Sequence, residues 1–252
     1  MIKTAAVIGA GISGMQAALS LAERGVKVYL VENTSSIGGI MARLDKTMPT
    51  LDCSICILSP FMLSVARNPL IEVITLADVV GAEMTADGYR LEVLKHPRYV
   101  DLDKCTGCRD CMAKCPGKVE LPYEGKFAKT KAIHFDFDQA IPAVPYIDRG
   151  ARLHFTKGVC GNCAKFCDKG AIDFEQAEET AYLDVGGVFL ATGSVPYLPY
   201  DRPEYGYGKY PNVITAMELE RLLSAAGPTG GHVLRANDKR EPKNIAFINC
   251  VG

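Results

Sequence analysis

The sequence predicts an α/β protein in which a smaller α+β domain interrupts a larger domain built on a parallel sheet. Three observations support this fold class. Residues 2–32 alternate strand, glycine-rich turn, helix and strand, which is the βαβ pattern. From about residue 99 the chain is rich in Cys, Gly, Pro and Lys and has little periodicity, and a strand pattern returns near residue 180. We therefore expect one domain formed by residues 1–98 and 177–252, and an inserted domain at 99–176.

The elements before the insertion follow from their apolar periodicity. "IKTAAVI" at 2–8 predicts a buried strand, and the helix after it ends at Gly25, a residue typical of helix C-termini. "VKVYLVE" at 26–32 predicts the next strand of the same sheet. Residues 71–94 predict two further strands with a hairpin at the turn "ADG".

The elements after the insertion return to the pattern of the first domain. "VGGVFLATG" predicts a strand that ends in Ala-Thr-Gly. Thr215 and Glu218 have the spacing of a capping box and predict a helix over residues 215–226. "NIAFINCV" at 244–251 predicts a last strand, directly before the chain ends. A domain rarely stops on an interior strand, so we expect the fold to be C-terminally incomplete.

Composition and charge exclude several classes of function. The chain has 252 residues, enough for a sizeable hydrophobic core, and a formal net charge of −1. It has neither the basic field nor the basic tail of proteins that bind nucleic acid or membrane surfaces. No apolar run reaches the roughly 18 residues of a membrane-spanning helix. The first strand leaves no room for a signal peptide, so we expect a cytoplasmic protein with no nucleic-acid partner and no membrane span.

Ten cysteines are many for a cytoplasmic protein. Clustered cysteines in a reducing compartment indicate metal or redox chemistry more often than disulfides. Nine of the ten fall into three groups, at 53/56, 105/108/111/115 and 160/163/167, and Cys250 stands alone. Each group therefore needs its own chemical interpretation.

A dinucleotide site is predicted at the first turn. Gly9, Gly11 and Gly14 form a G-x-G-x-x-G run between a strand and a helix, which is the fingerprint of a Rossmann-like domain. The glycines allow a tight turn and a close approach of the backbone to a pyrophosphate, which the helix N-terminus then faces. Glu32 ends the next strand, where an acid binds ribose hydroxyls and favours FAD or NAD over NADP.

Two later glycine-containing motifs favour FAD. The pair Gly38-Gly39 follows the acid by six residues, and "ATG" at 191–193 closes the domain. Both features are similar to those of flavoproteins with two dinucleotide-binding domains, whereas a Rossmann domain that binds NAD, or no ligand, is the alternative. The candidate FAD-binding residues are Gly9, Gly11, Ile12, Ser13, Gly14, Glu32, Asn33, Gly38, Gly39, Arg43, Leu44, Val79, Ala191, Thr192 and Gly193.

An iron–sulfur site is predicted in the inserted domain. The run C-x2-C-x2-C-x3-C-P is the ferredoxin pattern for a [4Fe–4S] cluster, and its cysteines are Cys105, Cys108, Cys111 and Cys115. Zinc is the alternative, but zinc sites prefer two separated C-x2-C pairs.

A second run gives three more cysteines, Cys160, Cys163 and Cys167, with Lys157 where a fourth is expected. In two-cluster ferredoxins the last cysteine of each run binds the other cluster. By this rule the first cluster is bound by Cys105, Cys108, Cys111 and Cys167. The second cluster then has Cys115, Cys160 and Cys163 and needs one further ligand, from elsewhere in the chain or from a partner. A three-iron cluster, or no second cluster, is the alternative.

Cys53 and Cys56 are the candidate catalytic residues, and three interpretations of them remain open. In the first, they form a redox dithiol beside the flavin, as in disulfide reductases. In the second, they supply ligands to a cluster, because the second cluster lacks one. In the third, they are ordinary buried cysteines, because "CSICIL" is apolar.

The motifs together resemble a known family. "GGIMARLDKTMPTLDCSICILSP", "KAIHFDFDQAIPAVPYID", "GAIDF", "ATGS" and "YGYGKYPNVITAMELERLL" are similar to stretches of the A subunit of heterodisulfide reductase. The flavoprotein subunit of quinone-interacting oxidoreductase complexes is more distantly similar. The resemblance implies a thioredoxin-reductase-like FAD domain with an inserted two-cluster ferredoxin domain.

The resemblance also implies an activity and partners. In that family, FAD takes an electron pair and can split it between a disulfide and ferredoxin. A hydrogenase or formate dehydrogenase supplies the electrons, and subunits of the B and C types reduce the heterodisulfide. A flavin wired to clusters converts between two-electron and one-electron transfer, which fits the motifs.

The chain departs from the family pattern at two places that bear on function. Lys157 replaces an expected cysteine, and the chain stops at "FINCVG", where the family continues into further cysteines and a C-terminal half. The resemblance therefore implies the N-terminal portion of a longer subunit: the product of a split gene, with a separate polypeptide supplying the rest, the product of an early stop, or a fragment. A non-catalytic iron–sulfur module of a split subunit is the alternative function. A third alternative, a flavoprotein like the small subunit of glutamate synthase, would need a second G-x-G-x-x-G run, which this sequence lacks.

Overall fold

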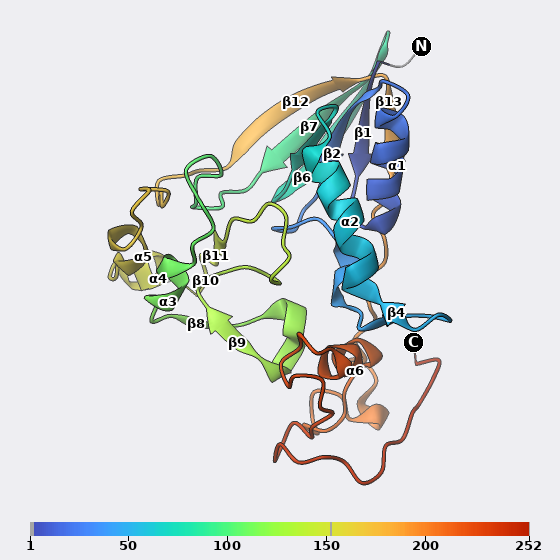
Figure 1. Cartoon of the computed structure of the whole chain (residues 1–252), viewed down its shortest axis with the longest axis vertical. Coiled ribbons are helices and arrows are strands. Elements are labelled where there is room, and N and C mark those ends of the chain that lie inside the picture. The colour runs from blue at the N-terminus through green and yellow to red at the C-terminus, as the bar shows by residue number, and fades with distance from the viewer. Residues whose placement is uncertain (1–2, 152, 252) are drawn as a thin grey trace.

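The computed structural model describes residues 3–151 and 153–251 and has a four-stranded parallel sheet (Figure 1). The strand order is β13-β1-β2-β5. The strands, in that order, are Gly187–Leu190, Thr4–Ile8, Lys27–Val31 and Ile71–Ile74. The predicted βαβ unit is therefore confirmed, and its sheet contains strands from both sides of the segment 96–178.

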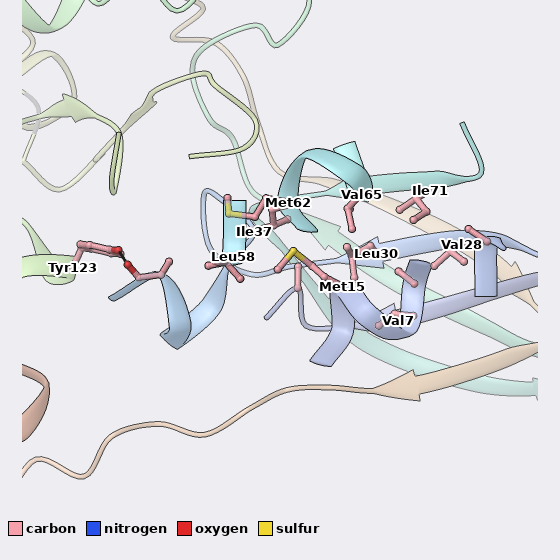
Figure 2. Packing of buried hydrophobic residues seen from close by; sticks show 14 residues of the cluster. Val7, Met15, Val28, Leu30, Ile37, Leu58, Met62, Val65, Ile71 and Tyr123 are labelled. Carbon is pink, nitrogen blue, oxygen red and sulfur yellow. Dashed lines mark hydrogen bonds between the residues drawn. The ribbon is translucent and has the colours of Figure 1, made fainter. Parts of the chain in front are cut away.

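Two helices cover one face of this sheet. They are α1 (Ile12–Ala22) and α2 (Ser54–Arg67), and they pack on each other. Met15 of α1 and Leu58 and Met62 of α2 are fully buried and meet side chains of β1 and β2 (Figure 2). Strand alternation explains which side chains reach them, because successive residues of a strand point to opposite faces.

A second, three-stranded antiparallel sheet covers the other face. Its order is β12-β7-β6, with β6 at Ala77–Thr85, β7 at Gly88–Lys95 and β12 at Glu179–Val185. The hairpin predicted at "ADG" joins β6 and β7, with a bulge between Val79 and Gly81. Apolar side chains of the two sheets form a separate core between them.

Residues 96–178 leave the second sheet after β7 and return to it at β12, and they form short elements. These are α3 (Asp110–Ala113), β8 (Lys118–Glu120), η2 (Pro122–Phe127), β9 (Lys129–Lys131), β10 (Ile133–His134), β11 (Tyr146–Ile147), α4 (Leu153–Lys157) and α5 (Asn162–Lys165). The small core of this segment includes Cys111, Cys115 and Cys163. Cysteine side chains are thus part of the core of this segment.

Three short elements, η1 (Gly39–Arg43), β3 (Lys46–Thr47) and β4 (Asp52–Cys53), connect β2 to α2. After β13 the chain forms η3 (Pro203–Tyr205) and α6 (Ala216–Leu223). The capping box predicted for α6 is present in full, and the helix ends three residues earlier than predicted. No helix in the described part of the chain is long and apolar enough to cross a membrane.

The strand predicted at 244–251 is wrong. These residues form no strand, and Ile245, Phe247 and Ile248 are exposed. An alternating apolar segment becomes a strand only when a neighbouring strand satisfies its backbone groups, and none of the described strands pairs with it.

Candidate cofactor sites

Two of the three glycines of the first turn, Gly9 and Gly14, have no room for a side chain. Gly9 follows β1 with a φ of +98°, and a Cβ there would lie 2.3 Å from the carbonyl oxygen of Ala191. A Cβ on Gly14 would lie 1.8 Å from the Gly9 carbonyl oxygen. The turn is therefore closed from both sides, by α1 and by the Ala-Thr-Gly segment after β13.

The second glycine pair packs directly on the first turn. Gly39 has a φ of +59°, and a Cβ on it would lie 2.9 Å from the Cα of Gly11. The backbone N–H of Gly38 donates a hydrogen bond to the carbonyl of Ala10 at 2.9 Å. The cradle thus consists of backbone from the turn after β1, the start of η1 and the end of β13, as a pyrophosphate site requires.

Glu32 is buried and holds the turn itself. Its Oε2 accepts a hydrogen bond from the N–H of Ala10 at 2.8 Å. Its Oε1 accepts from the N–H of Thr34 at 2.9 Å and from the Thr34 hydroxyl at 2.8 Å. A carboxylate has about four acceptor sites, so these three bonds leave capacity for a ribose hydroxyl.

Eight FAD candidates remain, and four of them adjoin the cradle. Ile12 and Ser13 begin α1, and Thr192 and Gly193 follow Ala191 past the end of β13, so these four adjoin the cradle. Arg43 ends η1 and Leu44 follows it, and both are half-buried, whereas Asn33 is exposed. Val79 lies at the bulge of β6 and packs in the core between the two sheets.

Four cysteines of the segment 96–178 line one cavity of about 120 Å³. They are Cys105, Cys108, Cys111 and Cys167. Three come from the first run and one from the second, and they are the set that the crossover rule assigns to the first cluster. Sulfur is the donor type that iron–sulfur clusters require, so the residues present fit the group.

Burial affects one of the thiols in this cavity in particular. Burial raises the pKa of Cys111 to about 12, and the nearby Cys163 and Cys105 contribute to the rise. Metal binding therefore has to displace protons. Backbone N–H groups already point at sulfur, from Gly107 to Cys105 Sγ at 3.5 Å and from Ala171 to Cys167 Sγ at 3.3 Å.

The cysteines expected at the second cluster lie at two packed helices. Cys115 and Cys163 are buried, and Cys160 has a φ of +79° shortly before α5. The side chain of Asn162 donates to the Lys114 carbonyl at 3.4 Å and joins the two runs. Among the residues that the structure describes, no three potential ligands are gathered closely enough to hold a single metal ion.

Cys53 and Cys56 form a disulfide. Cys53 is the N-cap of α2, and its Sγ accepts a hydrogen bond from the N–H of Cys56 at 3.3 Å. β4 and the start of α2 lie on the opposite side of the molecule from α3 and α5 (Figure 1). The arrangement favours the redox interpretation and gives no support to a role of this pair as cluster ligands.

A polar junction between the two parts of the chain was missed by sequence reasoning. Arg98 is buried and donates to the carbonyls of Val144 at 2.8 Å and Ser35 at 2.6 Å, and to Thr75 Oγ1 at 2.8 Å. The hydroxyl of Ser35 donates to Asp136. Burial lowers the pKa of Arg98 to about 10, which leaves it charged near neutral pH. The segment 33–37 is therefore tied to the cysteine-bearing part.

Two family models match the chain. A model described as FAD dependent oxidoreductase matches residues 5–49, and a 4Fe-4S dicluster domain matches residues 98–140. FAD and 4Fe–4S clusters are thereby confirmed as the predicted cofactors. Among solved structures, L-lysine 6-monooxygenase from Pseudomonas syringae matches with a TM-score of 0.33 and 13% identity, over 79% of this chain and 37% of that one.

Curated relatives match over nearly the whole chain. The A subunit of the H(2):CoB-CoM heterodisulfide,ferredoxin reductase of Methanothermobacter marburgensis is 44% identical, over 98% of this chain and 37% of its own length. The second A-type iron-sulfur subunit of the CoB–CoM heterodisulfide reductase of Methanopyrus kandleri is 49% identical over the same shares. This chain thus spans little more than a third of the length of these relatives. Over that length it is homologous to the A subunit of heterodisulfide reductase, as its motifs predict.

Proposed function

We propose that this chain is the flavin- and cluster-carrying part of a heterodisulfide reductase-type complex. It passes electrons between a two-electron carrier and one-electron carriers. The observation that carries the proposal is the cavity that Cys105, Cys108, Cys111 and Cys167 line together, in the same polypeptide as the glycine cradle. Relatives named as heterodisulfide reductase subunits support the oxidoreductase assignment.

The residues of the cradle hold FAD. Gly9, Gly11 and Gly39 bring backbone to the pyrophosphate, and the N-terminal N–H groups of α1 face its charge. Glu32 keeps the turn closed through Ala10 and accepts a ribose hydroxyl with its remaining lone pairs. Bound FAD supplies exchange of one or two electrons.

The cysteines hold two [4Fe–4S] clusters. Cys105, Cys108, Cys111 and Cys167 bind the first, and their neighbouring N–H groups stabilise thiolate charge. Cys115, Cys160 and Cys163 bind the second, with one ligand from another residue or partner. The inserted ferredoxin-like domain at 99–176 is the unit that carries both.

The disulfide of Cys53 and Cys56 is a redox couple of the same chain. Its reduction consumes two electrons and two protons and gives two thiols, which matches the electron pair of a reduced flavin. Cys56 is exposed and therefore open to attack, and the N-cap position of Cys53 favours thiolate formation there.

The wider roles follow from the relatives. We assign the chain to the cytoplasm, with B- and C-type subunits, ferredoxin, and a hydrogenase or formate dehydrogenase as partners. A separate polypeptide, or further residues of the same one, supplies the parts of the relatives that this chain does not span. We further propose that this assembly divides an electron pair between a disulfide and ferredoxin.

The test is the content of FAD, iron and acid-labile sulfide per chain after anaerobic purification. About one FAD and about eight iron atoms, the content of two [4Fe–4S] clusters, is the expected result. Iron without FAD would favour the alternative, a cluster module whose flavin site needs another polypeptide. Zinc in place of iron would overturn the cluster assignment.

A further inference from the structure

Side chains from two distant segments bind the backbone at the end of η1. Tyr123 of η2 donates a hydrogen bond from its hydroxyl to the carbonyl of Ala42 (Figure 2). Arg221 of α6 donates from Nη1 to the carbonyl of Arg43 at 3.1 Å. The last carbonyls of a short helix have no partner within it, so these two bonds satisfy groups that the helix leaves open.

The helix α6 also binds the chain just after η1. The N–H of Asp45 donates to Oε2 of Glu220 at 2.9 Å, and Glu220 is the neighbour of Arg221 in α6. Two consecutive side chains of one helix therefore fix a carbonyl and an N–H that lie two residues apart. We call Tyr123, Glu124, Glu220 and Arg221 the η1 clamp.

Arg221 joins η1 to η2 through one planar group. Its Nε and Nη2 donate to the two oxygens of Glu124 at 3.0 and 2.8 Å, across 97 residues of sequence. The two side chains are 5% and 9% exposed. A buried ion pair contributes little net stability, because desolvation offsets its attraction. The two-pronged geometry of the pair leaves Nη1 aimed at the Arg43 carbonyl.

The ring of Tyr123 completes the packing of the clamp. The guanidinium carbons of Arg221 and Arg43 lie 4.9 and 5.8 Å from its centroid, and Phe137 stacks on it at 5.2 Å. Burial raises the pKa of Tyr123, so its hydroxyl stays protonated and remains a donor to Ala42. The ring thus restricts the same guanidinium that binds η1.

We propose that Arg221 and Glu124 are positioning residues of the FAD site, an inference that rests on the proposed function. They hold the far end of η1, so that Gly39 at its near end stays against Gly11. Glu124 belongs to the segment that carries the cluster cysteines, and Arg221 follows that segment. The clamp therefore makes the shape of the flavin site depend on both.

The variant Arg221→Lys tests the proposal. Lysine keeps the charge opposite Glu124, but its single ammonium group cannot reproduce the planar fork that also reaches the Arg43 carbonyl. We expect FAD binding to weaken about tenfold, as for loss of one hydrogen bond from a charged donor. The readouts are the dissociation constant of FAD, from flavin fluorescence, and iron per chain, which should not change.

The control is Arg90→Lys. Arg90 makes the same two-pronged contact with Asp184, at 2.8 and 3.0 Å, but on an exposed face of the second sheet. It should leave FAD affinity unchanged. An equal loss of affinity in both variants would overturn the proposal, and so would wild-type affinity in Arg221→Lys.

A double variant separates positioning from stability. Glu124→Gln with Arg221→Gln removes both buried charges and leaves neither unpaired, so the fold should survive. A glutamine side chain at position 221 is too short to reach the Arg43 carbonyl, and FAD should bind as weakly as in Arg221→Lys. Wild-type FAD affinity in this double variant overturns the positioning role while the proposed function stands. Failure of the unaltered chain to bind FAD overturns both.

Discussion

A Cβ on Gly9 would lie 2.3 Å from the carbonyl oxygen of Ala191, which belongs to a segment far along the chain. The glycine cradle is therefore complete only when β13 lies beside β1. Its two halves are separated in sequence by all of the cysteine-bearing segment.

Gly9→Ala should abolish FAD binding. The new methyl group would displace the Ala-Thr-Gly segment and disfavour the positive φ, at a cost of about 1–2 kcal/mol for the φ alone. FAD per purified chain is the measurement. Gly25→Ala is the control, because Gly25 also has a positive φ, +76°, but open space around it. It should lose stability through its φ alone and keep its FAD.

Cys167→Ala should remove the cluster that the first run begins. Cys167 shares a cavity with Cys105, Cys108 and Cys111, so the loss should be about four iron atoms per chain.

Cys115→Ala should leave that cluster and remove the other one. Electron paramagnetic resonance of the reduced variants distinguishes the two clusters. Cys250→Ala, at an exposed position, should change neither. Full iron content in Cys167→Ala would contradict the crossover assignment.

The double variant Cys53→Ser with Cys56→Ser should retain all of its iron. The two cysteines form a disulfide on the side of the molecule away from α3 and α5. Alkylation under denaturing conditions, with and without reduction, should show two additional labels in the unaltered chain and none in the variant. A loss of iron would instead identify the pair as cluster ligands.

The ion pairs of His96 with Asp78 and Glu178 should stabilise the folded protein more in acid than in base. His96 binds Oδ2 of Asp78 through Nε2 at 2.8 Å and Oε1 of Glu178 through Nδ1 at 3.0 Å. The hydrogen bond to Asp78 is the main cause that raises its pKa above 6.5, and Glu178 raises it further. A raised folded-state pKa gives stability that is full below about pH 6.5 and is lost as pH rises through the folded-state value.

The measurement is the free energy of unfolding of His96→Gln against the unaltered chain at pH 6 and pH 9. The difference should be larger at pH 6, by less than about 1 kcal/mol because the ion pair is partly exposed. His232→Gln, at an exposed position outside this ion pair, is the control. An equal difference at both pH values would contradict the assignment.

Local patterns predicted the local parts of the structure. The turn at Gly9, the hairpin of β6 and β7 and the capping box of Thr215 depend on residues close in sequence, and each is where the sequence indicates. The strand expected at 244–251 failed because a strand depends on a partner that lies elsewhere. Apolar periodicity indicates that a segment has one face suited to burial, but it does not indicate which strand would pair with that segment.

The site shows the same division. The spacing of cysteines, with a rule for exchanging the last one, identified the four that share a cavity. The hydrogen bonds of Glu32 to Ala10 and Thr34, and the contact of Arg221 with Glu124, were not predicted. Those contacts join residues whose spacing carries no signature. The residues around α6 resemble a known family, but a resemblance in sequence does not by itself indicate which backbone groups of η1 they bind.

Lys95 and Glu179 are opposite each other in the pairing of β7 with β12. The two ends of the long segment between them therefore emerge side by side, as the two ends of a tight hairpin do. Gene fusion or excision at this point would need only a short turn to close the remaining sheet. Excision would also remove Tyr123 and Glu124, so the remaining framework would lose contacts that hold η1.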